Sequence, residues 1–173
     1  MTTWADAGLL VLRLAITVIM FYHGTQKLFG WWHGQGLAEA AEFFARQGFR
    51  PPRLMALVAA FTETAGSLLL GSGLALVLGT AMLTGVLTNV VAIHVRNGMN
   101  VRKFGIEFEL SLLAGTVAIG LTDGGSWTLD ALLGVPRISW LGPAAVALGL
   151  LGGLAVVATR SRESAAANEA PAH

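Results

Sequence analysis

Glu63 is an ionisable residue in the middle of an apolar segment that is long enough to cross a bilayer. The segment runs from Leu54 to Gly73 and carries no other charge. On a helix, the residues one turn away from Glu63 are all small, namely Ala59, Ala60, Gly66 and Ser67. Because small residues let helices pack closely in lipid, we expect Glu63 to face another helix. A charge at this depth costs at least about 2.5 kcal/mol, so the carboxylate needs a partner or a proton.

Basic and titratable residues on the first apolar segment are the candidate partners of Glu63. Arg13, His23 and Lys27 fall within an arc of about 80° at 100° per residue. Two further polar residues, in the third and fourth apolar segments, fall in the same half of the membrane when 1.5 Å is counted per residue. The sequence therefore predicts a buried polar cluster of Arg13, His23, Lys27, Glu63, Asn89 and Glu107.

The predicted cluster has a chemical and a structural interpretation. Chemically, His23 and Glu63 offer a hydrogen-bond donor and a proton path to the carbonyl of a quinone. Structurally, an ion pair between Arg13 and Glu63 fixes the register of two helices without any chemistry. Lys27, at the membrane boundary, then serves only to anchor its helix at the headgroups. The spacing of the residues is compatible with both interpretations.

The composition and the absence of motifs exclude several kinds of chemistry. The chain has no cysteine, which excludes disulfides, iron–sulfur clusters and covalently attached c-type haem. His23 and His94 differ in face and depth, which argues against a b-type haem. Nucleotide-binding loops, a nucleophile elbow and a HExxH zinc site are missing, and the basic residues form no patch for nucleic acid. We expect no metal site, no nucleic-acid partner and no catalytic motif in this chain alone.

Membrane-spanning helices are the elements that must position these residues. The 173 residues are 54% hydrophobic and 12% charged, and their mean hydropathy is +0.66. These values are typical of an integral membrane protein, and a crossing takes about 20 apolar residues. The apolar segments of that length are residues 7–29, 54–73, 74–95, 104–122 and 140–159. The sequence thus predicts one all-α transmembrane domain over residues 1–159, with a tight hairpin between the second and third segments.

Two segments outside the spans have patterns of their own. Residues 37–47 repeat apolar side chains at helical spacing within a polar context, which predicts a short helix at the membrane surface. Residues 160–173 are polar and rich in alanine, and we expect a disordered cytoplasmic tail.

Local patterns near the end of the chain suggest two smaller features. Thr128 is expected to cap a short outer helix that has Asp130 in its first turn. Gly149 and Gly153 form a GxxxG pattern that fits either dimerisation or packing inside the molecule. The sequence specifies no oligomeric state.

The distribution of basic residues predicts the orientation in a bacterial plasma membrane. Five crossings place most Lys and Arg residues on one side and leave Arg137 alone in a loop on the other. By the positive-inside rule, the N-terminus lies outside and the C-terminus lies in the cytoplasm.

Taken together, these motifs resemble the DoxX family of small bacterial membrane proteins. The resemblance extends over about residues 9–133 and rests on Arg13, His23-Gly24, Lys27-Leu28, Glu63 before a Gly-rich hairpin, and the motif GSWTLD at Gly125–Asp130. Thr128 stands in that motif where the family usually has serine. The resemblance implies a four-helix transmembrane bundle, to which residues 140–159 add a fifth helix, and it assigns Arg13, His23, Lys27, Glu63 and Glu107 to the family's polar positions.

The resemblance also implies a role in redox complexes. Members of the family are associated with a terminal quinol oxidase and a thiosulfate:quinone oxidoreductase, or with detoxifying enzymes in an oxidative-stress complex. The first hypothesis is therefore a membrane subunit of a quinone-linked oxidoreductase, with the quinone as its ligand. The alternatives are a non-enzymatic scaffold that recruits soluble redox enzymes and, ranked last, a small proton-coupled carrier.

Overall fold

The structure, a computed structural model, describes residues 3–160, and all regular secondary structure within this range is helical. The expected disordered tail lies outside the described residues apart from Arg160. In chain order the elements are α1 (Thr3–Phe29), η1 (Trp31–His33), α2 (Gly36–Arg46), α3 (Pro52–Ser72), α4 (Leu76–His94), η2 (Val95–Asn97), η3 (Val101–Lys103), α5 (Glu107–Leu121), α6 (Leu129–Leu132) and α7 (Leu141–Ala158).

Four of the described helices, α1, α3, α4 and α7, are long and apolar enough to cross a membrane. Their outward faces carry apolar side chains, as on α7, where Leu148, Leu151 and Leu154 are all more than half exposed. A soluble protein rarely leaves such a continuous apolar surface in water. The prediction of an all-α integral membrane bundle is confirmed.

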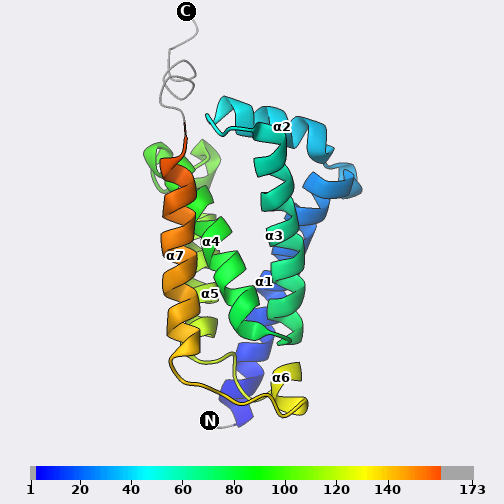
Figure 1. Ribbon diagram of the computed structural model, residues 1–173, viewed down its shortest axis with the longest axis vertical. Coiled ribbons are helices and arrows are strands. Elements are labelled where there is room, and N and C mark those ends of the chain that lie inside the picture. Colours follow the sequence, from blue (N-terminus) through cyan, green and yellow to red (C-terminus); the bar gives the residue numbers. More distant parts are fainter. Residues whose placement is uncertain (1–2, 161–173) are drawn as a thin grey trace, which may run out of the picture.

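The long helices run along one common direction (Figure 1). The α3–α4 hairpin is flanked by α1, which packs on α3, and by α7, which packs on α4. α2 lies across one end of the bundle and α6 lies at the other, and we call these the α2 end and the α6 end. The first residues of α1 lie at the α6 end and the last residues of α7 at the α2 end, so the chain traverses the bundle an odd number of times.

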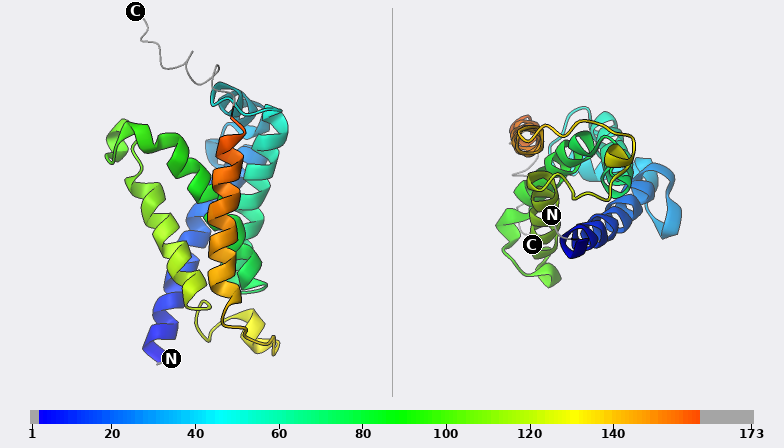
Figure 2. Two further views of the ribbon diagram at one scale, coloured as in Figure 1. Left: turned by 60° about the vertical axis from the view of Figure 1, so that its left-hand side comes forward. Right: turned by 90° about the horizontal axis from the view of Figure 1, so that it is seen from below.

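α5 is shorter than the expected segment, residues 104–122. Its 15 residues measure about 22 Å, compared with about 30 Å for the bilayer core. The helix starts late because Phe104 adopts a left-handed conformation with φ 56°, and its carbonyl accepts a hydrogen bond from Asn97 Nδ2. α5 nevertheless returns the chain from the α2 end to the α6 end, beside α4 (Figure 2).

Glycines in α7 allow it to pack closely on α4. A Cβ atom at Gly153 would lie 2.5 Å from the carbonyl oxygen of Gly85 and 2.8 Å from Cβ of Thr88. At Gly149 it would lie 2.6 Å from Cβ of Thr84. Packing inside the molecule therefore accounts for the GxxxG pattern.

The loop at the α6 end caps two helices. Thr128 Oγ1 accepts a hydrogen bond from the Ala131 amide at 3.1 Å, which caps α6, as the sequence predicts. Asp130 does more than support α6, because its two carboxylate oxygens accept hydrogen bonds from the amides of Ala75 and Leu76, each at 2.9 Å. It therefore caps α4 across the hairpin, where α3 ends at the left-handed Gly73.

Candidate functional site

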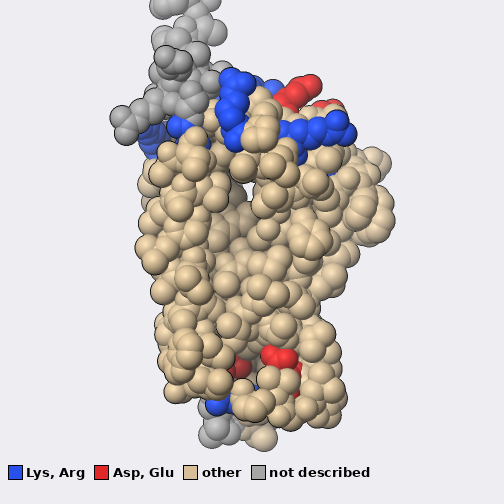
Figure 3. Space-filling model, viewed as in Figure 1, with Lys and Arg blue, Asp and Glu red and all other residues tan. Residues whose placement is uncertain are grey.

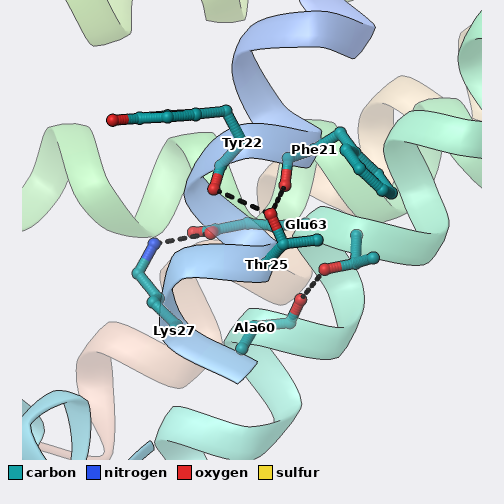
Figure 4. A network of polar contacts seen from close by, with 7 residues as sticks. Phe21, Tyr22, Thr25, Lys27, Ala60 and Glu63 are labelled. Atoms are coloured by element: carbon teal, nitrogen blue, oxygen red, sulfur yellow. Dashed lines mark hydrogen bonds and ion pairs between the residues drawn. The ribbon is translucent and has the colours of Figure 1, made fainter. Parts of the chain in front are cut away.

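Glu63 forms an ion pair with Lys27 inside the bundle. Lys27 Nζ donates a hydrogen bond to Glu63 Oε2 at 2.5 Å, and Figure 4 shows the two side chains meeting between α1 and α3. The Glu63 side chain is 4% exposed, whereas that of Lys27 is 30% exposed. The carboxylate is thus enclosed by protein, while the ammonium retains partial access to its surroundings.

Gly24 is the residue that brings α1 close enough to α3 for this contact. A Cβ atom at position 24 would lie 2.7 Å from the amide nitrogen of Thr64 and 3.0 Å from the carbonyl oxygen of Ala60. Because Gly24 has no side chain, the two backbones approach closely one turn before Lys27. The small residues around Glu63 do face neighbouring helices, as expected: Ala60 meets α1, and Gly66 meets Leu83 of α4.

Arg13 does not join Glu63, and the predicted Arg13–Glu63 ion pair is wrong. Arg13 is 1% exposed and lies toward the α6 end, where it donates hydrogen bonds to the carbonyl oxygens of Gly124 at 3.1 Å and Trp127 at 2.6 Å. Arg13 lies almost four helical turns before Lys27, which places it about 21 Å away along the helix at 1.5 Å per residue. Its contacts hold the loop after α5 against α1.

Lys27, and not Arg13, is the ion-pair partner of Glu63. Counting from the helix ends places Lys27 at the membrane boundary and Glu63 well inside, which assumes that α1 and α3 end at the same level. Figure 1 shows that α3 extends further toward the α2 end than α1 does. Lys27 therefore lies level with Glu63, and its interpretation as a mere headgroup anchor is wrong.

An apolar groove of about 580 Å³ opens beside this ion pair. The groove lies between α3 and α7 with α4 as its floor, and Phe43 and Phe44 of α2 close it at the α2 end. In Figure 3 the surface is hollowed between the α3 and α7 sides, beneath the Lys and Arg residues gathered at the α2 end. Its polar lining residues are Lys27, Thr62, Glu63, Asn89 and His94. We call it the lateral groove, since its walls are membrane-spanning helices.

His94 and Glu109 form a second acid–base pair next to the groove. His94 Nδ1 lies 3.5 Å from Glu109 Oε1, and both side chains are largely buried. Neither His94 nor Glu109 belongs to the predicted cluster, because helical angles turn His94 away from Asn89. They meet because they occupy facing ends of α4 and α5, which a loop joins; that adjacency was the available signal. Asn89, a member of the predicted cluster, is 8% exposed and lines the lateral groove.

His23 and Glu107 occupy different positions from those expected. His23 is close enough to Lys27, Glu63 and Glu109 to interact with their charges, and its ring contacts Phe108 edge-on. It lines a separate cavity at the α2 end and not the lateral groove. Glu107 lies outside the cluster, because it is exposed and accepts a hydrogen bond from the Val101 amide at 2.9 Å.

The arrangement suits a ligand that is apolar over most of its length and polar at one end. The long walls of the groove offer hydrocarbon contact, and its few polar lining residues include both members of the Lys27–Glu63 ion pair. Lys27 supplies a charged hydrogen-bond donor there, and Glu63 supplies a carboxylate that accepts. Within the described residues, no group of three His, Asp or Glu side chains is placed to hold a metal ion.

The sequence profile of the DoxX family matches residues 8–96. This match covers half of the chain and extends over α1 to α4, which contain the Lys27–Glu63 pair and Asn89. It ends before the GSWTLD motif, although the resemblance seen in the sequence extends further. No curated protein and no solved structure matches the chain. The chain belongs to the DoxX family of membrane proteins.

Proposed function

We propose that this protein is a membrane subunit of a quinone-linked oxidoreductase and that it holds a quinone in the lateral groove. The observation that carries this proposal is the apolar groove of about 580 Å³ that has the Lys27–Glu63 pair in its wall. A quinone has the matching chemistry, because a polar ring with two carbonyl groups is joined to a long apolar tail. The tail follows the apolar walls of the groove toward the lipid, and the ring lies beside the Lys27–Glu63 pair.

The polar residues have separate roles in this proposal. Lys27 donates a hydrogen bond to one quinone carbonyl, and Glu63 keeps the ammonium in place. Asn89 and His94 lie on the α4 wall and offer donors to the second carbonyl. Reduction of a quinone to a quinol takes two electrons and two protons. A partner oxidoreductase supplies the electrons, and the groups of this chain pass the protons.

The charge distribution supports the proposed orientation in the bacterial plasma membrane. Lys and Arg residues gather at the α2 end and are sparse at the α6 end (Figure 3). By the positive-inside rule, the α2 end faces the cytoplasm and the first residues of α1 face the outside. Partner enzymes on the cytoplasmic side then meet α2 and the loop between α4 and α5.

Titration with a short-chain menaquinone analogue in detergent tests the proposal. Gly152 lines the groove and has no atom within 4 Å of an added Cβ, so Gly152→Phe adds a large side chain at the groove whose Cβ meets no atom of the bundle. Gly8→Phe is the matched control, because Gly8 has equal space but lies outside the groove. We expect saturable binding by the wild type and Gly8→Phe, and at least about tenfold weaker binding by Gly152→Phe and Glu63→Gln. Folded wild-type protein without saturable binding would overturn the proposal.

A scaffold without a ligand is the second candidate, favoured by the polar surface at the α2 end. It predicts that Glu63→Gln leaves partner binding intact, whereas substitutions in the loop between α4 and α5 abolish it. Quinone-dependent turnover of the co-purified complex separates the two functions, because with Glu63→Gln a quinone-linked subunit keeps its partners but loses turnover, whereas a scaffold keeps both.

A further inference from the structure

A second cavity lies at the α2 end, and it differs in character from the lateral groove. Its volume is about 380 Å³, and it lies between the last turns of α1, the turn through η1 and α2. Its polar lining residues are His23, Gln26, Lys27, His33 and Gln35. We call it the polar vestibule. A cavity lined by such polar side chains is favourable for water and unfavourable for hydrocarbon.

Lys27, Phe43 and Phe44 line both the polar vestibule and the lateral groove. One lysine and two aromatic rings of α2 are thus the residues that the two cavities share. Glu63 lines the groove but not the vestibule. The exposed fractions agree with this arrangement, because the Lys27 side chain is 30% exposed and its partner Glu63 is 4% exposed.

We propose that the Lys27–Glu63 pair is the junction of two separate access routes, with water and its protons entering through the polar vestibule and a lipid-soluble ligand entering through the lateral groove. Phe43 and Phe44 are the barrier between the routes, since two apolar rings exclude water where the cavities adjoin. The water route stands independently of the ligand's identity, whereas the ligand route rests on the proposed function.

The junction lets a proton pass from water to a ligand that never leaves the membrane. Lys27 gives one proton of its ammonium group to the ligand and becomes a neutral amine. A proton from vestibule water then binds the same nitrogen and restores the ammonium. Glu63 of α3 pairs with this nitrogen, and His23 of α1 interacts with the charges of Lys27, Glu63 and Glu109 of α5. His33 lines the same vestibule.

Single-cysteine labelling tests the two routes directly. The chain contains no cysteine, so each introduced thiol is the only one present. Gln26→Cys and His23→Cys place a thiol in the vestibule, and Ala59→Cys places one in the groove. The full-length protein is reconstituted in a bilayer and treated with a charged, membrane-impermeant thiosulfonate or with a lipid-soluble maleimide. Labelling of the unfolded protein gives the total thiol content of each variant.

The proposal predicts opposite reactivities for the two sets of thiols. The charged reagent should label Gln26→Cys and His23→Cys at least about tenfold faster than Ala59→Cys, because a charged group is unfavourable in an apolar groove. The maleimide should label Ala59→Cys readily. A menaquinone analogue should protect Ala59→Cys and leave Gln26→Cys unchanged.

Two results would overturn the proposal. Protection of both vestibule thiols from the charged reagent would mean that water does not reach Lys27 by this route. Equal labelling of Gln26→Cys and Ala59→Cys by the charged reagent would mean that the two routes are not separate. The predicted labelling without any effect of the quinone analogue would refute the proposed function and leave the water route intact, so the two failures are distinguishable.

Discussion

Removal of Lys27 should destabilise the protein much more than removal of Glu63, although the two side chains form one ion pair. Lys27→Met leaves a carboxylate whose side chain is 4% exposed without a partner. A lone charge in the membrane interior costs about 2.5 to 3.5 kcal/mol on insertion scales, and loss of one partner of a buried pair costs about 3 to 5 kcal/mol. We therefore expect Lys27→Met to lower the free energy of unfolding by about 3 kcal/mol.

Glu63→Gln should lower the free energy of unfolding less, because the remaining charge, the ammonium of Lys27, can reach water. The Lys27 side chain is 30% exposed and borders the polar vestibule, so its ammonium can turn toward water. The amide oxygen of glutamine also still accepts a hydrogen bond. We expect a loss of about 1 kcal/mol or less, as for partly exposed pairs. The double variant removes both charges, so it should be more stable than Lys27→Met by about 2 kcal/mol.

Reversible unfolding in mixed detergent micelles, followed by circular dichroism, measures all three free energies. Lys103→Met is a matched control, because Lys103 is exposed in η3 and should change stability by less than about 0.5 kcal/mol. Equal losses for Lys27→Met and Glu63→Gln would refute the asymmetry of burial. Additive losses in the double variant would refute the ion pair itself.

Three further substitutions test the packing and the loop at the α6 end by the same unfolding assay. Gly24→Ala should cost about 1 to 3 kcal/mol because its Cβ meets α3, whereas Gly8→Ala should be neutral or stabilising; equal effects would contradict the close approach of α1 and α3. Arg13→Met should cost about 2 kcal/mol and speed amide exchange in the loop that Arg13 holds; unchanged exchange would show that the loop is held by other contacts. Asp130→Ala should cost about 1 kcal/mol through loss of the α4 cap; no loss would mean that the cap adds no stability.

Much of the fold follows from hydropathy because the bilayer requires long apolar helices. The helix α2 and the Thr128 cap also follow from local patterns that do not depend on distant contacts. The late start of α5 could not be predicted, since it depends on the left-handed Phe104 in the preceding turn. Neither could the second role of Asp130, because its partners Ala75 and Leu76 are more than 50 residues away in the chain.

The candidate site was predicted only in part. The small residues around Glu63 indicate that it faces another helix, and they do so correctly. The choice between Arg13 and Lys27 as its partner depends on how far α1 is displaced along α3, which single-helix geometry does not determine. The lateral groove depends on the arrangement of α3, α4 and α7, and no local pattern encodes it.

Photo-crosslinking in membranes shows where a quinone binds on this protein. A photoreactive quinone analogue is activated in the reconstituted protein, and the modified peptides are identified by mass spectrometry. If a quinone occupies the lateral groove, the labels fall on groove residues such as Ala59, Met82 and Gly152, and unlabelled quinone suppresses them. Labels confined to the lipid-facing side of α1, where Val11 and Val18 are 67% and 69% exposed, would contradict it.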